Sequence, residues 1–255
     1  MHERQGNLVG AGLWELSRIL LPEVQGQNNL QTAKEHLTQG SVLLYSNHYH
    51  DFDPFSLGRV IDSHLTPLEH VDILTSRRHL DSQRGPVNRL QNFLVDKMKA
   101  EKGFNPILVV QNYDKEKYPD AEEFNKRALV EAVRDLRLPG RILSIAPEGT
   151  RSRTGGLLEA QEGLEPILRL SRKTTLALPI AMEPTLTTPS FIRARVLVGE
   201  PFSYDDIIAE QESHPDFSVS DLMMLKIARL LSPQRRGFYG PLVQRYELSP
   251  EAVPA

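Results

Sequence analysis

Short apolar runs alternate with longer amphipathic segments along most of this chain. We expect strands over residues 41–46, 70–75, 106–110, 141–146 and 176–182, and helices over 53–61, 87–100, 119–138 and 157–170. Residues 192–198 read as an edge or half-exposed strand, and helices near 205–211 and 219–231 close the chain. This order predicts an α/β fold, with a largely parallel central sheet flanked by helices and an N-terminal helical segment.

The domain organisation follows from the same pattern. Residues 1–40 are expected to form an N-terminal helical cap, with a helix over 8–21 and a second one over 30–37 that Gly40 ends. Residues 41–248 are expected to form one α/β domain, and residues 249–255 a loose tail. No internal repeat or change in composition marks a further boundary.

Composition and charge exclude several classes of function. The chain has 255 residues, a net charge of −3 and no cysteine, so cysteine nucleophiles and cysteine-based zinc sites are excluded and no nucleic-acid partner is expected. No apolar run approaches the length of about 18 residues that a membrane-spanning helix needs, and no secretory signal is evident. We expect a cytoplasmic protein that associates peripherally with the membrane.

The first chemical motif follows the strand predicted over 41–46 and reads Asn47-His48-x4-Asp53-Pro54. A neutral imidazole at His48 can take a proton from a hydroxyl, and Asp53 can hold its other ring nitrogen. The alternative is purely structural, with a turn histidine followed by an aspartate that caps the next helix.

A second motif, residues 146–153, follows the strand predicted over 141–146 and reads Ala-Pro-Glu-Gly-Thr-Arg-Ser-Arg. Its glycine permits close backbone approach, and Arg151 and Arg153 are suited to bidentate contacts with phosphate or carboxylate. The alternative is a solvated polar loop with an internal Glu–Arg pair. Two such motifs in this order, each at the end of a predicted strand, would rarely occur together by accident.

Together the two motifs resemble the signatures of the glycerol-phosphate and 1-acylglycerol-3-phosphate acyltransferase family, over roughly residues 41–183. The resemblance implies that the two motif loops meet at one site, where His48 is the general base and Asp53 its partner. It also implies that the acceptor is bound by the second motif, through Glu148, Gly149, Thr150, Arg151 and Arg153. Leu178-Pro179-Ile180 is similar to an apolar strand of the family near the acyl donor, and reads equally well as a core strand.

The chain also departs from the family pattern. Gln111 and Gln161 stand where many members carry basic residues, and the two motifs are farther apart than in compact members. Arg77, Arg78, Lys115 and Lys117 are candidates for supplying the missing charge.

We therefore expect an acyltransferase of phospholipid biosynthesis. It would move a fatty acyl group from acyl-CoA or acyl carrier protein to a glycerol-phosphate or lysophospholipid hydroxyl, with no cofactor or metal. A metal centre at His48-x-His50 is not supported, since Phe52 and Asp53 stand where the metallo-hydrolase pattern needs Asp and His. The alternatives are an esterase or lysophospholipase, and a non-catalytic lipid-binding protein on the same fold.

Membrane contact has one candidate segment. Residues 8–21 read either as a helix docked on the core or as an interfacial helix with Trp14 at headgroup level. Gly155-Gly156 is expected to be a flexible turn. Residues 235–239 read either as a contact for anionic headgroups or as a solvated surface turn, and we favour the turn.

Overall fold

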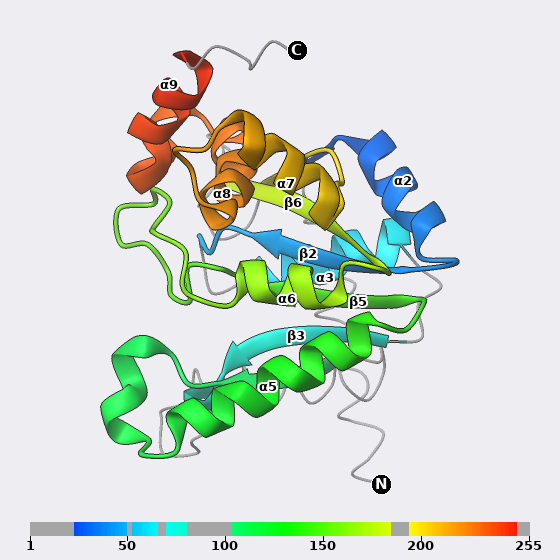
Figure 1. Ribbon diagram of the computed structural model, residues 1–255, viewed down its shortest axis with the longest axis vertical. Coiled ribbons are helices and arrows are strands. Elements are labelled where there is room, and N and C mark those ends of the chain that lie inside the picture. The colour runs from blue at the N-terminus through cyan, green and yellow to red at the C-terminus, as the bar shows by residue number, and fades with distance from the viewer. Residues whose placement is uncertain (1–22, 50–52, 66–69, 81–103, 185–193, 249–255) are drawn as a thin grey trace, which may run out of the picture.

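The computed structural model describes residues 23–49, 53–65, 70–80, 104–184 and 194–248. Within them, seven strands form one sheet in the order β1-β7-β6-β2-β5-β3-β4, with helices on both faces (Figure 1). Strands β6, β2, β5, β3 and β4 run parallel, and β7 is antiparallel to β6. The expected α/β fold with a largely parallel sheet is confirmed.

The strands and helices alternate along the chain as expected. The strands are β1 Glu23–Gln25, β2 Ser41–Ser46, β3 His70–Ser76, β4 Phe104–Val109, β5 Arg141–Ile145, β6 Thr175–Pro184 and β7 Ala194–Val198. The helices are α2 Gln27–His36, α3 Asp53–Val60, α5 Ala121–Leu136, α6 Leu164–Ser171, α7 Tyr204–Ser213, α8 Val219–Leu230 and α9 Gly240–Leu248. Short 3₁₀ turns include Arg77–Leu80, Asn112–Lys117, Pro233–Arg235 and Gly237–Tyr239.

Strand β2 is the centre of the sheet and is buried along its whole length. Successive side chains of a strand point to opposite faces. Leu43 and Tyr45 accordingly join one hydrophobic cluster with α5, α6, α7 and α8, while Val42 and Leu44 join a second cluster with α2 and α3. Burial on both faces explains why this strand reads as a continuous apolar run.

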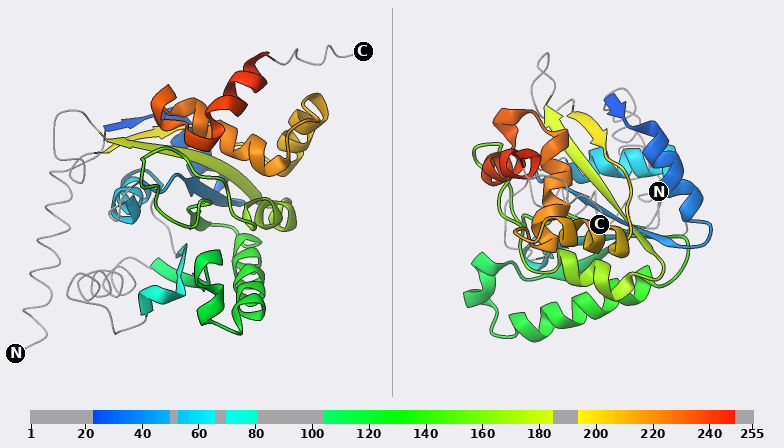
Figure 2. Two further views of the ribbon diagram at one scale, coloured as in Figure 1. Left: turned by 90° about the vertical axis from the view of Figure 1, so that its left-hand side faces the viewer. Right: turned by 45° about the horizontal axis from the view of Figure 1, so that its top comes forward.

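The C-terminal helices cover the first of these faces. In the right-hand view of Figure 2, the yellow strands β6 and β7 run between the orange and red helices α8 and α9 on one side and the blue helix α2 on the other. Helices α7 and α8 both begin with a capping box, formed by Ser203 with Asp206 and by Ser218 with Asp221.

Several sequence expectations need correction. Glu23–Gln25 forms a strand that pairs with β7, so residues within the expected helical cap over 1–40 belong to the sheet. This strand also covers the outer side of β7, which is half-exposed but not an edge. Helix α6 begins at Leu164 rather than near 157, and α9 was not expected. The helices expected over 8–21 and 87–100 and the tail over 249–255 lie outside the described residues.

We also asked whether any of these helices could span a membrane. Within the described part of the chain, no helix combines the length and the apolar character that crossing a bilayer requires.

Candidate active site

The two motif loops meet because β2 and β5 are parallel neighbours. Val42 pairs with Ile142 and Tyr45 with Ile145, so the loops after Ser46 and Ile145 leave the same edge of the sheet. Carboxyl ends of parallel strands are where ligand sites of open α/β sheets lie. The sequence prediction that both motifs build one site is consistent with this register.

The first motif contains a close His–Asp pair. Nδ1 of His48 lies 3.0 Å from Oδ2 of Asp53, which is the first residue of α3. The Asp53 side chain is 7% exposed and the His48 side chain 26%, so the carboxylate is shielded while the ring reaches the surface. An Nδ1–H bonded to the carboxylate leaves the lone pair on Nε2, which is the form that can accept a proton from a substrate.

Asn47 fixes the turn between β2 and the histidine. Its Nδ2 donates to the carbonyl of Met182 at 2.9 Å, and the backbone N–H of Met182 donates to its Oδ1 at 2.7 Å. A buried amide that satisfies both backbone groups of one β6 residue ties the motif to the neighbouring strand. Sequence reasoning gave Asn47 no role, because nothing in the sequence shows which strand lies beside it.

Glu148 is a buried connection between the two motifs. It is 2% exposed, and its Oε1 and Oε2 accept the backbone N–H groups of His48 and Leu158, both at 2.7 Å. Burial raises the pKa of Glu148 to about 7, against the opposing effect of these two hydrogen bonds. The observed contacts thus position the histidine loop. The expected contact of Glu148 with the acceptor stays a prediction.

The remaining residues of the second motif lie on the turn that follows. Gly149 has a φ of +66°, and a Cβ there would come within 2.5 Å of Oε1 of Gln111. Thr150 is half-buried, and Arg151 and Arg153 are exposed. Both arginines are thus exposed residues of the loop that follows β5, at the edge of the sheet that carries His48.

Gln111 and Gln161 flank this turn. Both side chains lie against Gly149, and Nδ2 of Asn112 donates to Oε1 of Gln161. The backbone N–H of Gln161 donates to the carbonyl of Pro147 at 2.8 Å. The two positions at which many family members carry cations are thus brought together here as neutral amides.

Of the candidate replacement cations, two are engaged elsewhere. Nη1 of Arg77 donates to both carboxylate oxygens of Asp120, at 3.1 and 3.0 Å, and its guanidinium also lies against the rings of Tyr118 and Phe124. Nζ of Lys117 lies 2.6 Å from Oδ1 of the buried Asp114. Arg78 is more weakly held, with Nη1 3.9 Å from Oδ2 of Asp114, and Lys115 is exposed.

The segment before α9 packs against residues 156–160, which follow the second motif, and this corrects two expectations in part. The backbone N–H of Leu157 donates to the carbonyl of Arg235 at 3.0 Å, and that of Phe238 donates to the carbonyl of Leu157 at 2.9 Å. The hydroxyl of Tyr239, a fully buried side chain, accepts the N–H of Ala160 at 3.1 Å. Gly237 and Phe238 of this turn are exposed, as expected, but Tyr239 is buried and the backbone of the turn is hydrogen-bonded to Leu157. The adjoining Gly156 is packed against Gly237 rather than loose.

Comparison with known proteins agrees with this geometry. The family model described as Acyltransferase matches residues 22–183, which include both motifs and strands β1 to β6. The chain belongs to the acyltransferase family. In this acyltransferase the His48–Asp53 pair and the Glu148 loop lie at one edge of the sheet. Residues 235–239, which pack against residues 156–160, lie beyond the matched part.

Two further comparisons add little to the family assignment. A solved structure, the 1-acyl-sn-glycerophosphate acyltransferase PlsC from Thermotoga maritima, is similar at 15% identity with a TM-score of 0.46, over 91% of this chain and 84% of that one. None of the curated proteins compared with this sequence is a match.

Proposed function

We propose that this acyltransferase moves a fatty acyl group from a thioester of coenzyme A or acyl carrier protein to the hydroxyl of a glycerol-phosphate or lysophospholipid acceptor, as a step of phospholipid biosynthesis. The observation that carries the proposal is the His48–Asp53 pair at 3.0 Å, with Glu148 fixing the backbone of His48. This pair follows the fully buried strand β2, and the hydrogen bonds of Asn47 and Glu148 fix the loop that carries His48.

The proposed reaction needs one base. Nε2 of His48 accepts the proton of the acceptor hydroxyl while its oxygen attacks the thioester carbonyl carbon. The tetrahedral intermediate then loses its C–S bond, the thiolate leaves, and the imidazolium returns the proton to sulfur. Asp53 stabilises the imidazolium during the intermediate. The products are an ester and a free thiol, and no acyl-enzyme is formed.

The exposed arginines of the second motif support a phosphorylated acceptor. A guanidinium can hold two oxygens of one phosphate, and Arg151 and Arg153 are both exposed on the loop that follows β5. Gln111 and Gln161 add neutral hydrogen-bonding groups beside the same loop, which suit the hydroxyl and ester groups of a glycerol backbone. An acceptor with both a phosphate and a polar glycerol unit fits this combination.

Thiol release distinguishes this proposal from the alternatives. Purified protein is incubated with a long-chain acyl-CoA alone, and with acyl-CoA plus glycerol 3-phosphate, 1-acylglycerol 3-phosphate or a zwitterionic lysophospholipid. Release that depends on one acceptor and yields its ester supports the proposal. Acceptor-independent release indicates a thioesterase, hydrolysis of the lysophospholipid indicates a lysophospholipase, and binding of lipid without any turnover indicates a lipid-binding protein.

We also propose that the enzyme works at a membrane surface, since its lipid substrates and products partition into bilayers. Co-sedimentation with vesicles containing anionic lipid is expected, with less binding at high salt. Emission from Trp14, which is the one tryptophan of the sequence, should shift on vesicle addition if residues 8–21 lie in the interface. Binding without such a shift would place the contact elsewhere on the protein.

A further inference from the structure

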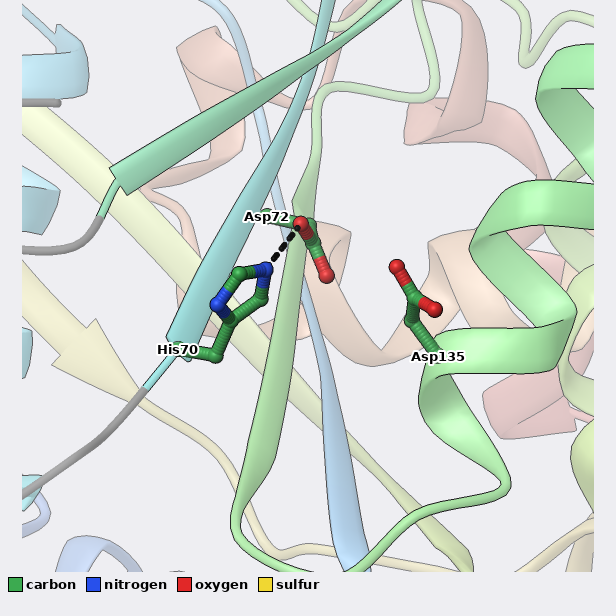
Figure 3. A group of neighbouring side chains, drawn as sticks. All are labelled: His70, Asp72 and Asp135. Atoms are coloured by element: carbon green, nitrogen blue, oxygen red, sulfur yellow. Dashed lines mark ion pairs between the residues drawn. The ribbon is translucent and has the colours of Figure 1, made fainter.

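A second group of chemically active side chains lies away from the motif loops. His70 is the first residue of β3 and pairs with Arg141, the first residue of β5, so it lies at the opposite end of the sheet from His48. Asp72 is two residues on and shares a face with His70. Asp135 comes from the last turn of α5, which covers this face (Figure 3).

The three side chains converge on one point. One ligand atom from each, an imidazole nitrogen and two carboxylate oxygens, lies within 4.8 Å of the others. Nε2 of His70 is 3.4 Å from Oδ1 of Asp72, and Asp72 is 1% exposed. Figure 3 shows the Asp72 carboxylate between the His70 ring and the Asp135 carboxylate, with the two carboxylates turned toward each other.

Ordinary ion pairs and hydrogen bonds leave this arrangement incompletely explained. A charge-assisted N–H···O bond is about 2.7–2.9 Å long, and the His70–Asp72 contact is longer. Nε of Arg134 reaches Asp135 at 3.2 Å, but its side chain is 72% exposed, where such pairs contribute little. The charge of Arg141, the neighbour of His70 on β5, stabilises the Asp72 carboxylate, but by less than Asp135 destabilises it. Two facing carboxylates, one of them buried, repel each other unless a proton or a cation lies between them.

The surroundings of Asp72 resemble the support that metal ligands receive. Nδ2 of Asn105 on β4 donates to Oδ1 of Asp72 at 2.9 Å, which fixes the orientation of the carboxylate. Its other oxygen is turned toward Asp135 (Figure 3). The His70 side chain is 34% exposed, which provides a route from solvent.

We propose that His70, Asp72 and Asp135 bind one divalent first-row transition-metal ion of the kind that accepts both imidazole and carboxylate ligands, with Zn²⁺ as the probe. Such ligands lie about 2.0–2.2 Å from the metal and therefore about 3.5 Å from one another, a separation that a small rotation of Asp135 would give. Three protein ligands leave at least one position for water. The ion would fasten the end of α5 to the start of β3.

This role is separate from acyl transfer, because the cluster lies at the other end of the sheet. Bound metal is expected to raise the melting temperature through mass action, while turnover at saturating substrate stays unchanged. The test therefore uses binding and stability as its readouts, and its result does not depend on the proposed acceptor or donor.

The experiment uses the untagged full chain, freed of metal with a chelator. Equilibrium dialysis against Zn²⁺ and thermal unfolding with and without Zn²⁺ are measured for wild type, His70→Asn, Asp135→Asn and the control Glu122→Gln. Glu122 is an exposed acid in the first turn of α5, at the far end of the same helix from Asp135. Far-UV circular dichroism verifies that each variant is folded.

Wild type and Glu122→Gln should each bind one equivalent of Zn²⁺, and Zn²⁺ should raise their melting temperatures. His70→Asn and Asp135→Asn should bind Zn²⁺ at least tenfold more weakly, and their melting temperatures should not rise. Zn²⁺ held equally by all four proteins would mean that other groups bind it, and the proposal would be wrong. Absence of saturable binding by wild type would equally overturn it, and would leave a shared proton between Asp72 and Asp135 as the explanation of the cluster.

Discussion

The backbone N–H of His48 donates to Oε1 of Glu148 at 2.7 Å, across 100 residues of sequence. The same carboxylate accepts the N–H of Leu158 through its other oxygen. One buried side chain of the second motif therefore holds the backbone of the first, and both are joined to the loop that the C-terminal segment covers. The position of the proposed base thus depends on a residue whose hydrogen bonds, within the described part of the chain, go to two backbone N–H groups.

Glu148→Gln should change how stability depends on pH. Burial raises the pKa of Glu148 from an ordinary 4.5 to about 7, so the folded state holds this proton more tightly than the unfolded chain does. Its contribution is therefore most favourable below pH 4.5 and is lost as pH rises to about 7, by roughly 3 kcal/mol in all. Glutamine does not titrate, so the variant should lack this part of the slope.

The measurement is the free energy of unfolding from urea titration at pH 5 and pH 8, for both proteins. Other groups titrate alike in the two chains, so their effects cancel in the difference. The substitution should cost more at pH 5 than at pH 8, in addition to about 1–3 kcal/mol at both pH values for turning an amide N–H₂ toward a backbone N–H. An equal cost at both pH values would mean that Glu148 titrates near its ordinary value in the fold.

His48→Ala and Asp53→Asn should both lose turnover while keeping the fold. Removing the base should lower kcat by about 10²–10⁴-fold. Asparagine at 53 keeps the size of the side chain, and it is also favoured at helix starts, so α3 should form. It cannot stabilise imidazolium and permits the wrong ring orientation, so a loss of at least about 100-fold is expected.

Thiol release in the presence of acceptor measures this loss, and circular dichroism checks folding. His64→Ala serves as the control, since His64 lies in the turn that follows α3 and not in the motif. A His48→Ala protein with near-wild-type turnover would remove the proposed mechanism.

The sequence predicted those strands and helices whose own residues carry a clear hydrophobic pattern. The continuous apolar run of Ser41–Ser46 indicates a strand that is buried on both faces. The amphipathic stretch over α5 indicates a helix that is buried on one face. Strand β1 has three residues, too few for a periodic signal, and α9 has a weakly apolar face with Val243 as its one buried residue. Such elements are defined by what they pack against, which a local pattern does not contain.

The same distinction applies to the site. His48 and Asp53 are five residues apart in the sequence, so their spacing was enough to predict their contact. The roles of Asn47 and Glu148 depend on Met182 and Leu158, which are distant partners fixed by strand order and loop path. Residues 235–239 were read as solvated because arginine, glycine and aromatic residues in a row give no sign that the backbone of Leu157 is paired with them.

Gly237→Ala should destabilise the protein through the C-terminal segment. Gly237 has a φ of +49°, and a Cβ there would lie 2.2 Å from the carbonyl oxygen of Leu157. The positive φ costs about 1 kcal/mol, and the backbone clash should add about 1–3 kcal/mol. Because Leu157 adjoins the Leu158 N–H that binds Glu148, kcat should also fall.

Gly140→Ala is the matched control, since Gly140 also has a positive φ of +71° but a Cβ there would lie 4.0 Å from its nearest neighbour, the carbonyl oxygen of Leu37. Urea unfolding and turnover are measured for both variants. Gly140→Ala should show the cost of φ alone and keep its turnover. Similar losses of stability in the two variants would mean that residues 235–239 can move away from Leu157 without cost.

Arg151→Lys should weaken the acceptor more than the donor. Arg151 is exposed on the loop after Glu148, where a guanidinium can hold two phosphate oxygens through charge-assisted bonds of roughly 1.5–3 kcal/mol each. Lysine keeps the charge and loses the fork, so one such bond should be lost and acceptor KM should rise by about tenfold or more. If Arg151 binds the phosphate equally well in the ground and transition states, kcat should change little.

Steady-state kinetics with a phosphorylated acceptor and its dephosphorylated analogue measure this effect on acceptor KM. Arg127→Lys, on the exposed face of α5, is the control. The increase in KM should be confined to the phosphorylated acceptor, because the analogue has nothing for the fork to hold. An equal loss with both acceptors would instead make Arg151 a structural residue of the loop, and recognition of the phosphate would then rest on other groups, Arg153 first among them.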